Sequence, residues 1–193
     1  MTLLIYFLLY LLLAFVWRTL LVYRKTGINP LTLSSADDAY GYVGRAFKVV
    51  IAASGLIVLL NAHPDLAGWL APIPDLRVPG LEILGWCLLL ASLVWVLIAQ
   101  AQMGLSWRIG IDSENPTELV QKGLFSVSRN PIFLSMRVTL LGVCLVAPSA
   151  ATLAVLIAGE ILIQVQVRLE ETHLADLHGE QYKTYQASVR RWL

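Results

Sequence analysis

Residues 131–168 read "PIFLSMRVTLLGVCLVAPSAATLAVLIAGEILIQVQVR", two apolar runs joined by the short segment "APSA". A helix needs about 20 residues to cross a hydrocarbon core of roughly 30 Å, and each run is close to that length. The short connection permits only a tight turn between two antiparallel helices. The stretch therefore predicts a transmembrane helical hairpin, with spans near 132–148 and 150–168.

Composition places the rest of the chain in the membrane as well. The 193 residues are 58% hydrophobic and 14% charged, with a mean hydropathy of +0.70, outside the range of ordinary soluble domains. The formal net charge of +1 and the lack of long like-charge runs exclude a nucleic-acid partner. Three more apolar stretches precede the hairpin, so we expect an all-α polytopic protein with five transmembrane helices, the first three near 2–22, 44–62 and 80–102.

Two apolar features carry no further function. The first run lacks a preceding basic region and a small-residue cleavage site, so we expect a retained helix rather than a signal peptide. Cys87 and Cys144 lie inside apolar runs and form no disulfide or metal pattern.

The distribution of Lys and Arg predicts the orientation. Basic residues gather in 23–48, in 103–131 and in the tail from Arg168 onward, whereas the loop 63–79 has only Arg77. Because basic loops stay in the cytoplasm, we expect a multi-pass protein of the cell membrane with its N-terminus outside and its C-terminus inside.

No internal repeat or low-complexity linker divides the chain, so residues 1–193 are expected to form one domain. Residues 1–103 would supply the first three helices, and residues 104–193 a loop, the hairpin and a cytoplasmic helical tail.

A helix start stands at the inner end of the hairpin. Asn130 suits the capping position and Pro131 the first helical position. With Arg129 beside it, this positive helix end could hold an anionic group, or it could be an ordinary cap whose Arg touches lipid phosphate.

Helix rise brings acidic residues to the same depth. Counted from the hairpin tip at 1.5 Å per residue, Pro131 and Glu170 lie about 27 and 32 Å away, so Glu170 and Glu171 reach the interface beside Arg129. Such apposed charges suit a zwitterionic ligand and equally suit a salt-bridge network.

Deeper in the membrane, Arg137 and Glu160 reach one depth on the two arms of the hairpin. Buried ionisable groups normally pair or line a cavity, so we expect an ion pair, either structural or in contact with substrate. Four glutamines near helix ends either add polar lining to a cavity or simply lie at the membrane interface: Gln100, Gln102, Gln164 and Gln166.

The tail predicts a short amphipathic helix after Gly179, with Tyr182, Tyr185 and Val189 at helical spacing, either lying over a site or simply packing. The pair Glu170 and His173 has the spacing of a di-iron ligand pair, but that architecture needs a second pair, so no metal is expected.

The motifs in combination resemble one group of enzymes. The runs "GLSWRIGI", "LVQKGLFSVSRNPIFLSM" and "EETHLADLHGEQYKTYQASVRRW", separated by the hairpin, resemble the isoprenylcysteine carboxyl methyltransferase and phospholipid methyltransferase group of integral membrane enzymes, over about residues 104–193. The carboxyl methyltransferases typically read Arg-His-Pro-x-Tyr where this chain has Asn130 and Phe133 at the His and Tyr positions.

The resemblance implies S-adenosyl-L-methionine as methyl donor, bound at the cytoplasmic face, and a lipophilic or lipid acceptor that enters from the bilayer. The matching cofactor-binding positions are Gly123, Leu124, Arg129, Asn130, Pro131, Glu170, Glu171, Tyr182 and Tyr185, with Arg190 in the tail pattern.

Two acceptor chemistries and one non-enzymatic alternative remain open at this point. A carboxylate acceptor needs no base and would be oriented by Arg108 or Arg137, whereas a phospholipid amine is protonated and would need a base such as Glu170. The alternative is a small membrane scaffold or carrier in which Arg137 and Glu160 form a structural pair.

Overall fold

The structure is a computed structural model that describes residues 1–32, 37–110 and 117–193. In this part of the chain the secondary structure is helical, with two isolated bridges, Leu31 with Ile109 and Pro72 with Ser149, and no strand. The all-α prediction is confirmed.

The first long helical segment contains three elements without a break: α1 (Thr2–Leu11), the π-helical turn η1 (Leu12–Trp17) and α2 (Arg18–Thr26). The segment ends at Gly27, whose φ of 72° is the left-handed conformation that commonly terminates helices. Next to the widened π turn, Gln100 Nε2 donates to the carbonyl of Ala14 at 2.8 Å, so this turn is tied to the third long helix.

Two further long helices follow. In α3 (Ala39–Asn61) the first turn is capped by Asp38, whose carboxylate accepts from Gly41 N at 2.7 Å. Short elements α4 (Pro64–Ala67), η2 (Gly68–Leu70) and η3 (Pro74–Leu76) then lead to α5 (Pro79–Met103), which continues into η4 (Gly104–Ser106).

The hairpin forms as predicted. α6 (Pro131–Val146) and α7 (Ala150–His178) are joined by three residues, and Ser149 with Thr152 forms a capping box that starts α7. The span predicted near 150–168 lies within α7, which continues as one helix to His178 and ends at Gly179, as the sequence predicts. Between residues 168 and 178 there is no Gly or Pro, and after Gly179 the tail forms α8 (Glu180–Ser188).

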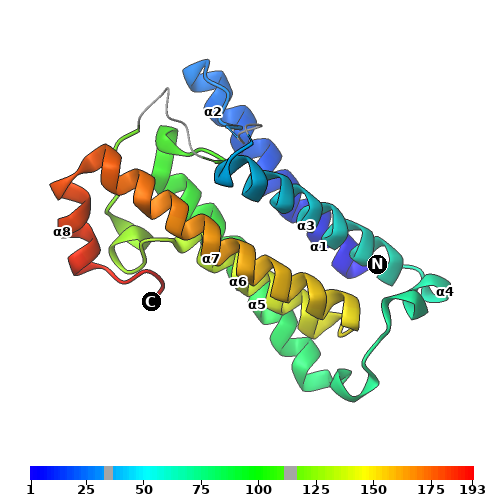
Figure 1. The fold of residues 1–193 in the computed structure, drawn as a ribbon. Helices are drawn as coiled ribbons and strands as arrows, with labels where there is room; N and C mark the ends of the chain where they lie inside the picture. Colours follow the sequence, from blue (N-terminus) through cyan, green and yellow to red (C-terminus); the bar gives the residue numbers. More distant parts are fainter. Residues whose placement is uncertain (33–36, 111–116) are drawn as a thin grey trace.

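Four helical segments are long and apolar enough to cross a membrane: Thr2–Thr26, Ala39–Asn61, Pro79–Ser106 and Ala150–His178. The fifth predicted span, α6, is an apolar helix of 16 residues, or roughly 24 Å. Figure 1 shows that the N-terminus, α4 and the hairpin tip lie at one end of the bundle, and α8 and the C-terminus at the other.

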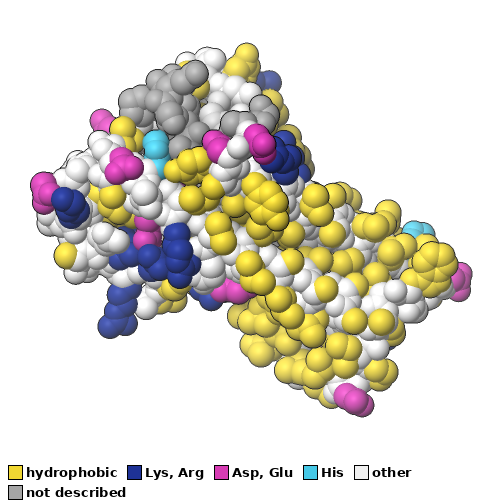
Figure 2. All heavy atoms as spheres, viewed as in Figure 1, with side chains coloured by type: hydrophobic (Ala, Val, Ile, Leu, Met, Phe, Trp, Pro, Cys, Tyr) yellow, Lys and Arg dark blue, Asp and Glu magenta, His cyan; other side chains and the backbone are white. Residues whose placement is uncertain are grey.

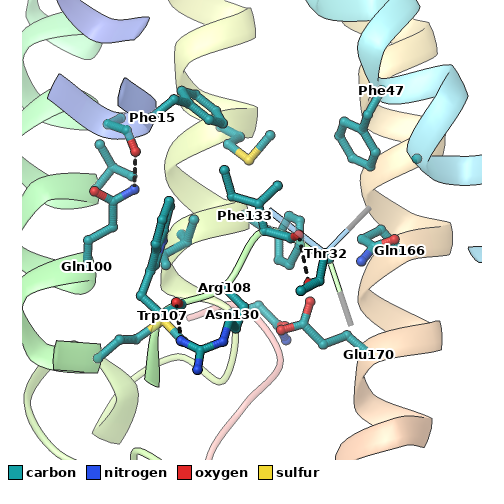
Figure 3. A pocket seen from close by; sticks show the side chains of 18 of the residues that line it. Phe15, Thr32, Phe47, Gln100, Trp107, Arg108, Asn130, Phe133, Gln166 and Glu170 are labelled. Atoms are coloured by element: carbon teal, nitrogen blue, oxygen red, sulfur yellow. Dashed lines mark hydrogen bonds between the residues drawn. The ribbon is translucent and has the colours of Figure 1, made fainter. Parts of the chain in front are cut away.

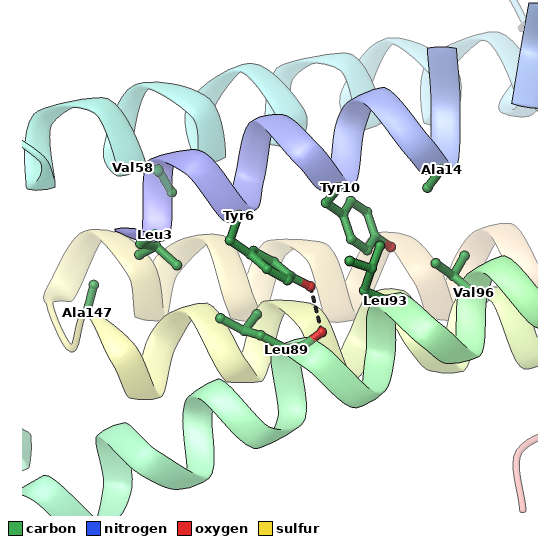
Figure 4. Packing of buried hydrophobic residues seen from close by; sticks show 9 residues of the cluster. All are labelled: Leu3, Tyr6, Tyr10, Ala14, Val58, Leu89, Leu93, Val96 and Ala147. Carbon is green, nitrogen blue, oxygen red and sulfur yellow. Dashed lines mark hydrogen bonds between the residues drawn. The ribbon is translucent and has the colours of Figure 1, made fainter. Parts of the chain in front are cut away.

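The long helices pack in a ring. Each contacts the next in the order α1, α5, α6, α7, α3 and back to α1. The closest approach is between α5 and α6, where a Cβ on Gly85 or Gly142 would lie 3.1 Å from the carbonyl of the other glycine, so small residues let the two backbones meet. Between α1 and α5, Tyr6 donates to the carbonyl of Leu89 at 2.7 Å within a cluster of buried apolar side chains (Figure 4).

Figure 2 shows hydrophobic side chains over most of the visible bundle, and Lys and Arg side chains toward the end that carries α8. This charge asymmetry agrees with the predicted grouping of basic residues.

Candidate functional site

A cavity of about 400 Å³ lies inside the ring at the α8 end of the bundle. Its upper part in Figure 3 is apolar, with Phe15 and Phe47 facing each other, and its lower part carries Arg108, Asn130 and Glu170. The cavity therefore joins a polar mouth to an apolar interior. Its polar lining comprises Thr32, Asp38, Tyr40, Lys48, Gln100, Arg108, Arg129, Asn130, Gln166, Glu170 and His173.

The Asn130 side chain does not have the predicted capping role. Asn130 occupies the N-cap position of α6, but its amide makes no cap hydrogen bond. Instead Nδ2 donates to Glu171 Oε1 at 3.0 Å and to the carbonyl of Arg191 at 3.3 Å. The amide is turned toward the carboxylate because two arginines hold that carboxylate beside it.

Glu171 is the centre of this cluster. Its carboxylate accepts from Arg191 Nη2 at 2.8 Å and from Arg129 Nη2 at 3.2 Å, and its side chain is only 6% exposed. Arg129 also donates to the carbonyls of Gln186 and Val189. Of the two open interpretations of the apposed charges, the salt-bridge network is what these residues form.

The tail is fastened to the loop before α6. Tyr185 donates its hydroxyl to the carbonyl of Phe125 at 2.6 Å, and Arg129 N donates to the carbonyl of Arg190 at 2.9 Å. Burial raises the pKa of Tyr182 above its ordinary value and that of Tyr185 to about 12, so both phenols stay neutral. We call the cluster of Arg129, Asn130, Glu171, Tyr185 and Arg191 the tail clasp.

The predicted tail helix is present, but it does not lie over the cavity. Tyr182 and Tyr185 are 1% and 5% exposed, and within the described chain no residue after His173 lines the cavity. The structure places both tyrosines in the packing between tail and loop, so they support the mouth of the cavity from outside.

Glu170 faces a different way from its neighbour. Successive helical residues are turned by about 100°, so Glu171 enters the tail clasp while Glu170 lines the cavity with Gln166 and His173, four residues before and three after. In the described residues no group of three His, Cys, Asp or Glu side chains is placed to hold a metal ion, at Glu170 and His173 or elsewhere.

Gly123 and Leu124 belong to the short helix η5 (Gly123–Ser126) and are bound to α5. Leu124 N donates to Gln102 Oε1 at 2.7 Å, and a Cβ on Gly123 would lie 2.3 Å from Gln102 Nε2. The Gln102 side chain therefore holds the loop at Leu124. Neither Gln102 nor Gly123 lines the cavity.

The predicted ion pair between Arg137 and Glu160 is confirmed, with Nε and Oε2 2.7 Å apart. Gln164 Nε2 donates to Glu160 at 2.8 Å, and the Arg137 guanidinium lies 4.4 Å from the centroid of Trp192. Neither Arg137 nor Glu160 lines the cavity, so this pair stands apart from the site. Arg108, by contrast, does line it, and donates to the carbonyls of Leu105 and Trp107 at 2.9 and 3.0 Å.

Sequence reasoning missed the part of the wall that comes from the first half of the chain. Tyr10, Phe15, Phe47 and Ile51 line the apolar interior, and Trp107 stands near the mouth. No signal in the sequence separates these side chains from lipid-facing ones, because both are large and apolar.

These features define an integral membrane protein with an amphipathic cavity at one end of a helical bundle. The model of the phospholipid methyltransferase family matches residues 81–181, more than half of the chain, and the protein belongs to this family. Family membership implies a membrane methyltransferase. No curated protein and no solved structure matches the chain significantly.

Proposed function

We propose that the protein is an S-adenosyl-L-methionine-dependent methyltransferase that methylates a lipophilic or amphipathic acceptor in this cavity. The main support for this proposal is one cavity, formed in part by residues 81–181, that joins polar groups at the membrane boundary to an apolar interior. A methyl donor of charged character and an acceptor with a hydrocarbon part can meet only in a space of this dual character.

The residues present fit the donor. S-adenosylmethionine carries three charged groups: an ammonium, a sulfonium and a carboxylate. The Glu170 carboxylate, which lines the cavity, is complementary to the two positive groups. The Asn130 side chain does not cap α6, so the backbone N–H groups of Ile132 and Phe133, two lining residues, suit the carboxylate of the donor. Trp107 and Phe125 offer aromatic surface for the adenine.

When bound, S-adenosylmethionine supplies an electrophilic methyl group. The protein's part is to hold the two reactants in line, which in favourable cases is equivalent to an effective molarity of about 10⁵ M or more. Glu170 would accept the proton of an amine acceptor, whereas Arg108 would orient an acidic one. Both side chains line the same cavity, so both acceptor chemistries remain within the proposal.

Gly123, Leu124, Arg129, Pro131, Glu171, Tyr182 and Tyr185 act in this proposal by shaping and supporting the mouth. Arg129, Asn130 and Pro131 also line the cavity, so the loop that the tail clasp holds is the wall next to the donor. Arg137 is left out of the proposed reaction because it lies outside the cavity and already pairs with Glu160.

We propose that the α8 end faces the cytoplasm. The basic residues Arg24, Lys25, Arg45, Lys48, Arg108, Lys122, Arg129, Arg168, Lys183, Arg190 and Arg191 lie in the segments that meet at this end.

Thermal unfolding of the purified protein with added S-adenosylmethionine, or its demethylated product, tests donor binding. Ligand at 100 times its Kd should stabilise the protein by about 2.7 kcal/mol and raise the Tm. Glu170→Gln should abolish most of this rise. The matched control is Asp176→Asn, an exposed acid on the same helix, which should retain it.

No Tm rise at millimolar donor would contradict the proposal and favour the scaffold alternative. Incubation with labelled donor, membrane lipids and small prenylated thiols, followed by identification of the labelled product, then names the acceptor.

A further inference from the structure

A second, smaller cavity adjoins the first inside the ring. It holds about 80 Å³ and is enclosed by α1, η1, α3, α6 and α7. The side chains that line both cavities are Tyr10, Phe15, Phe47, Ile51 and Met136. Because the same side chains border both cavities, the two spaces lie next to each other.

The hydroxyls of Ser54, Thr139 and Thr152 in the wall of the second cavity already donate hydrogen bonds within the protein. Ser54 Oγ donates to the carbonyl of Val50 at 2.7 Å, and Thr139 Oγ1 donates to the carbonyl of Ser135 at 3.0 Å. The Thr152 hydroxyl belongs to the capping box and donates to the carbonyl of Ala147 at 2.9 Å. A polar ligand would lose its hydration here without compensation, whereas a hydrocarbon would gain from burial.

The dimensions of this space suit a single chain. From Phe47 to Ile57 the wall of α3 rises about 15 Å. A volume of 80 Å³ over that length accommodates one row of about six water-sized groups, and not two rows side by side. The far end is formed by Ile57, Val143, Thr152 and Val155, near the hairpin tip.

We propose that the second cavity receives one hydrocarbon chain of the methyl acceptor and that Ile57 and Val155 limit its length. The inference rests on the proposed function, since it assigns the acceptor of the same site. It specifies an amphiphile that inserts one chain into the ring, so that any second chain stays in the bilayer.

The probes are S-alkyl-N-acetylcysteines and monoacyl lysophosphatidylethanolamines of graded chain length, added to the full-length protein in lipid nanodiscs. Binding is read from the Tm rise, and methylation from transfer of labelled methyl groups. For the wild type, we expect affinity to increase with chain length to a maximum and then to fall.

Variants move this maximum in opposite directions. Ser54→Phe fills the second cavity and should weaken the longest probes about tenfold, the effect of about two lost buried methylenes. Val155→Ala opens the far end and should shift the maximum to longer chains. The matched control Ala52→Phe adds the same ring to the exposed side of α3 and should leave the profile unchanged.

A Ser54→Phe profile identical to that of Ala52→Phe would overturn the inference. So would a diacyl phosphatidylethanolamine whose affinity depends on the lengths of both chains in the same way. If the donor still raises the Tm in that case, only the chain site is wrong; if the donor has no effect on the wild type, the proposed function fails instead.

Discussion

Asn130 and Glu171, 41 positions apart in the sequence, are joined by a hydrogen bond of 3.0 Å from the amide Nδ2 to the carboxylate Oε1. The bond connects the start of α6 to the far part of α7, and the two arginines on the same carboxylate add the tail to this connection. The tail clasp therefore fixes the polar mouth of the cavity without Glu171 lining it.

Loss of the Glu171 charge should open the tail clasp. Glu171→Gln keeps the volume but leaves Arg129 and Arg191 without their carboxylate, and we expect a loss of about 3 kcal/mol. The measurement is the Tm in detergent, together with protease cleavage of the tail. Glu180→Gln removes an exposed acid that pairs with Lys183 and should change stability by less than about 0.5 kcal/mol. Equal Tm values for the two variants would refute the clasp.

Gly123→Ala should destabilise the loop for two reasons. Its φ of 65° disfavours any side chain, and a Cβ would push the Gln102 amide away from its hydrogen bond with Leu124 N. We expect a cost of about 2 kcal/mol or more. Gly27→Ala separates the two causes, because Gly27 has a φ of 72° but open space around it, and should cost about 1 kcal/mol. A Gly123→Ala variant no less stable than Gly27→Ala would show that the contact with Gln102 is unimportant.

Arg137→Met should reduce stability without reducing the affinity for the methyl donor. The change leaves Glu160 without its ion-pair partner and removes the stacking on Trp192, for which we expect about 1–3 kcal/mol. The double variant Arg137→Met with Glu160→Gln should recover part of the lost Tm, since no unpaired charge remains. A large fall in the affinity of Arg137→Met for the methyl donor would show that Arg137 does take part in the active site.

Tyr185→Phe should weaken the attachment of the tail by about 1 kcal/mol through the lost bond to the Phe125 carbonyl. The control is Tyr42→Phe at a tyrosine that is 66% exposed, where no change is expected. An unchanged Tm in Tyr185→Phe would show that the Tyr185 hydroxyl does not contribute to the stability of the tail clasp and that the arginines supply it.

The same tyrosine predicts a pH dependence. Its pKa is raised from 10.0 to about 12, so between these values the unfolded chain loses the phenolic proton while the folded chain keeps it. Stability supplied by the buried phenol is complete below pH 10 and is lost as pH rises toward 12. The Tm of the wild type should fall over this range, and that of Tyr185→Phe should fall less.

The helical class, the hairpin and the meeting of distant charges could all be predicted from the amino-acid sequence. Hydrophobic runs and the short segment APSA between them leave few structures possible in a membrane, and the fixed rise of a helix places Arg137 beside Glu160 before any packing is known. The same arithmetic brought Arg129 to Glu171.

The packing of the helices determines which side of α7 lines the cavity and which side joins the tail clasp. Glu170 and Glu171 are identical residues next to each other, and the packing of α7 against α3 and α6 turns one into the cavity and the other into the tail clasp. It also decided that Phe15 and Phe47 face a cavity instead of lipid. An apolar side chain is about equally stable in an apolar cavity and in lipid. The residue types therefore do not show which of the two a side chain faces, and the helix packing does.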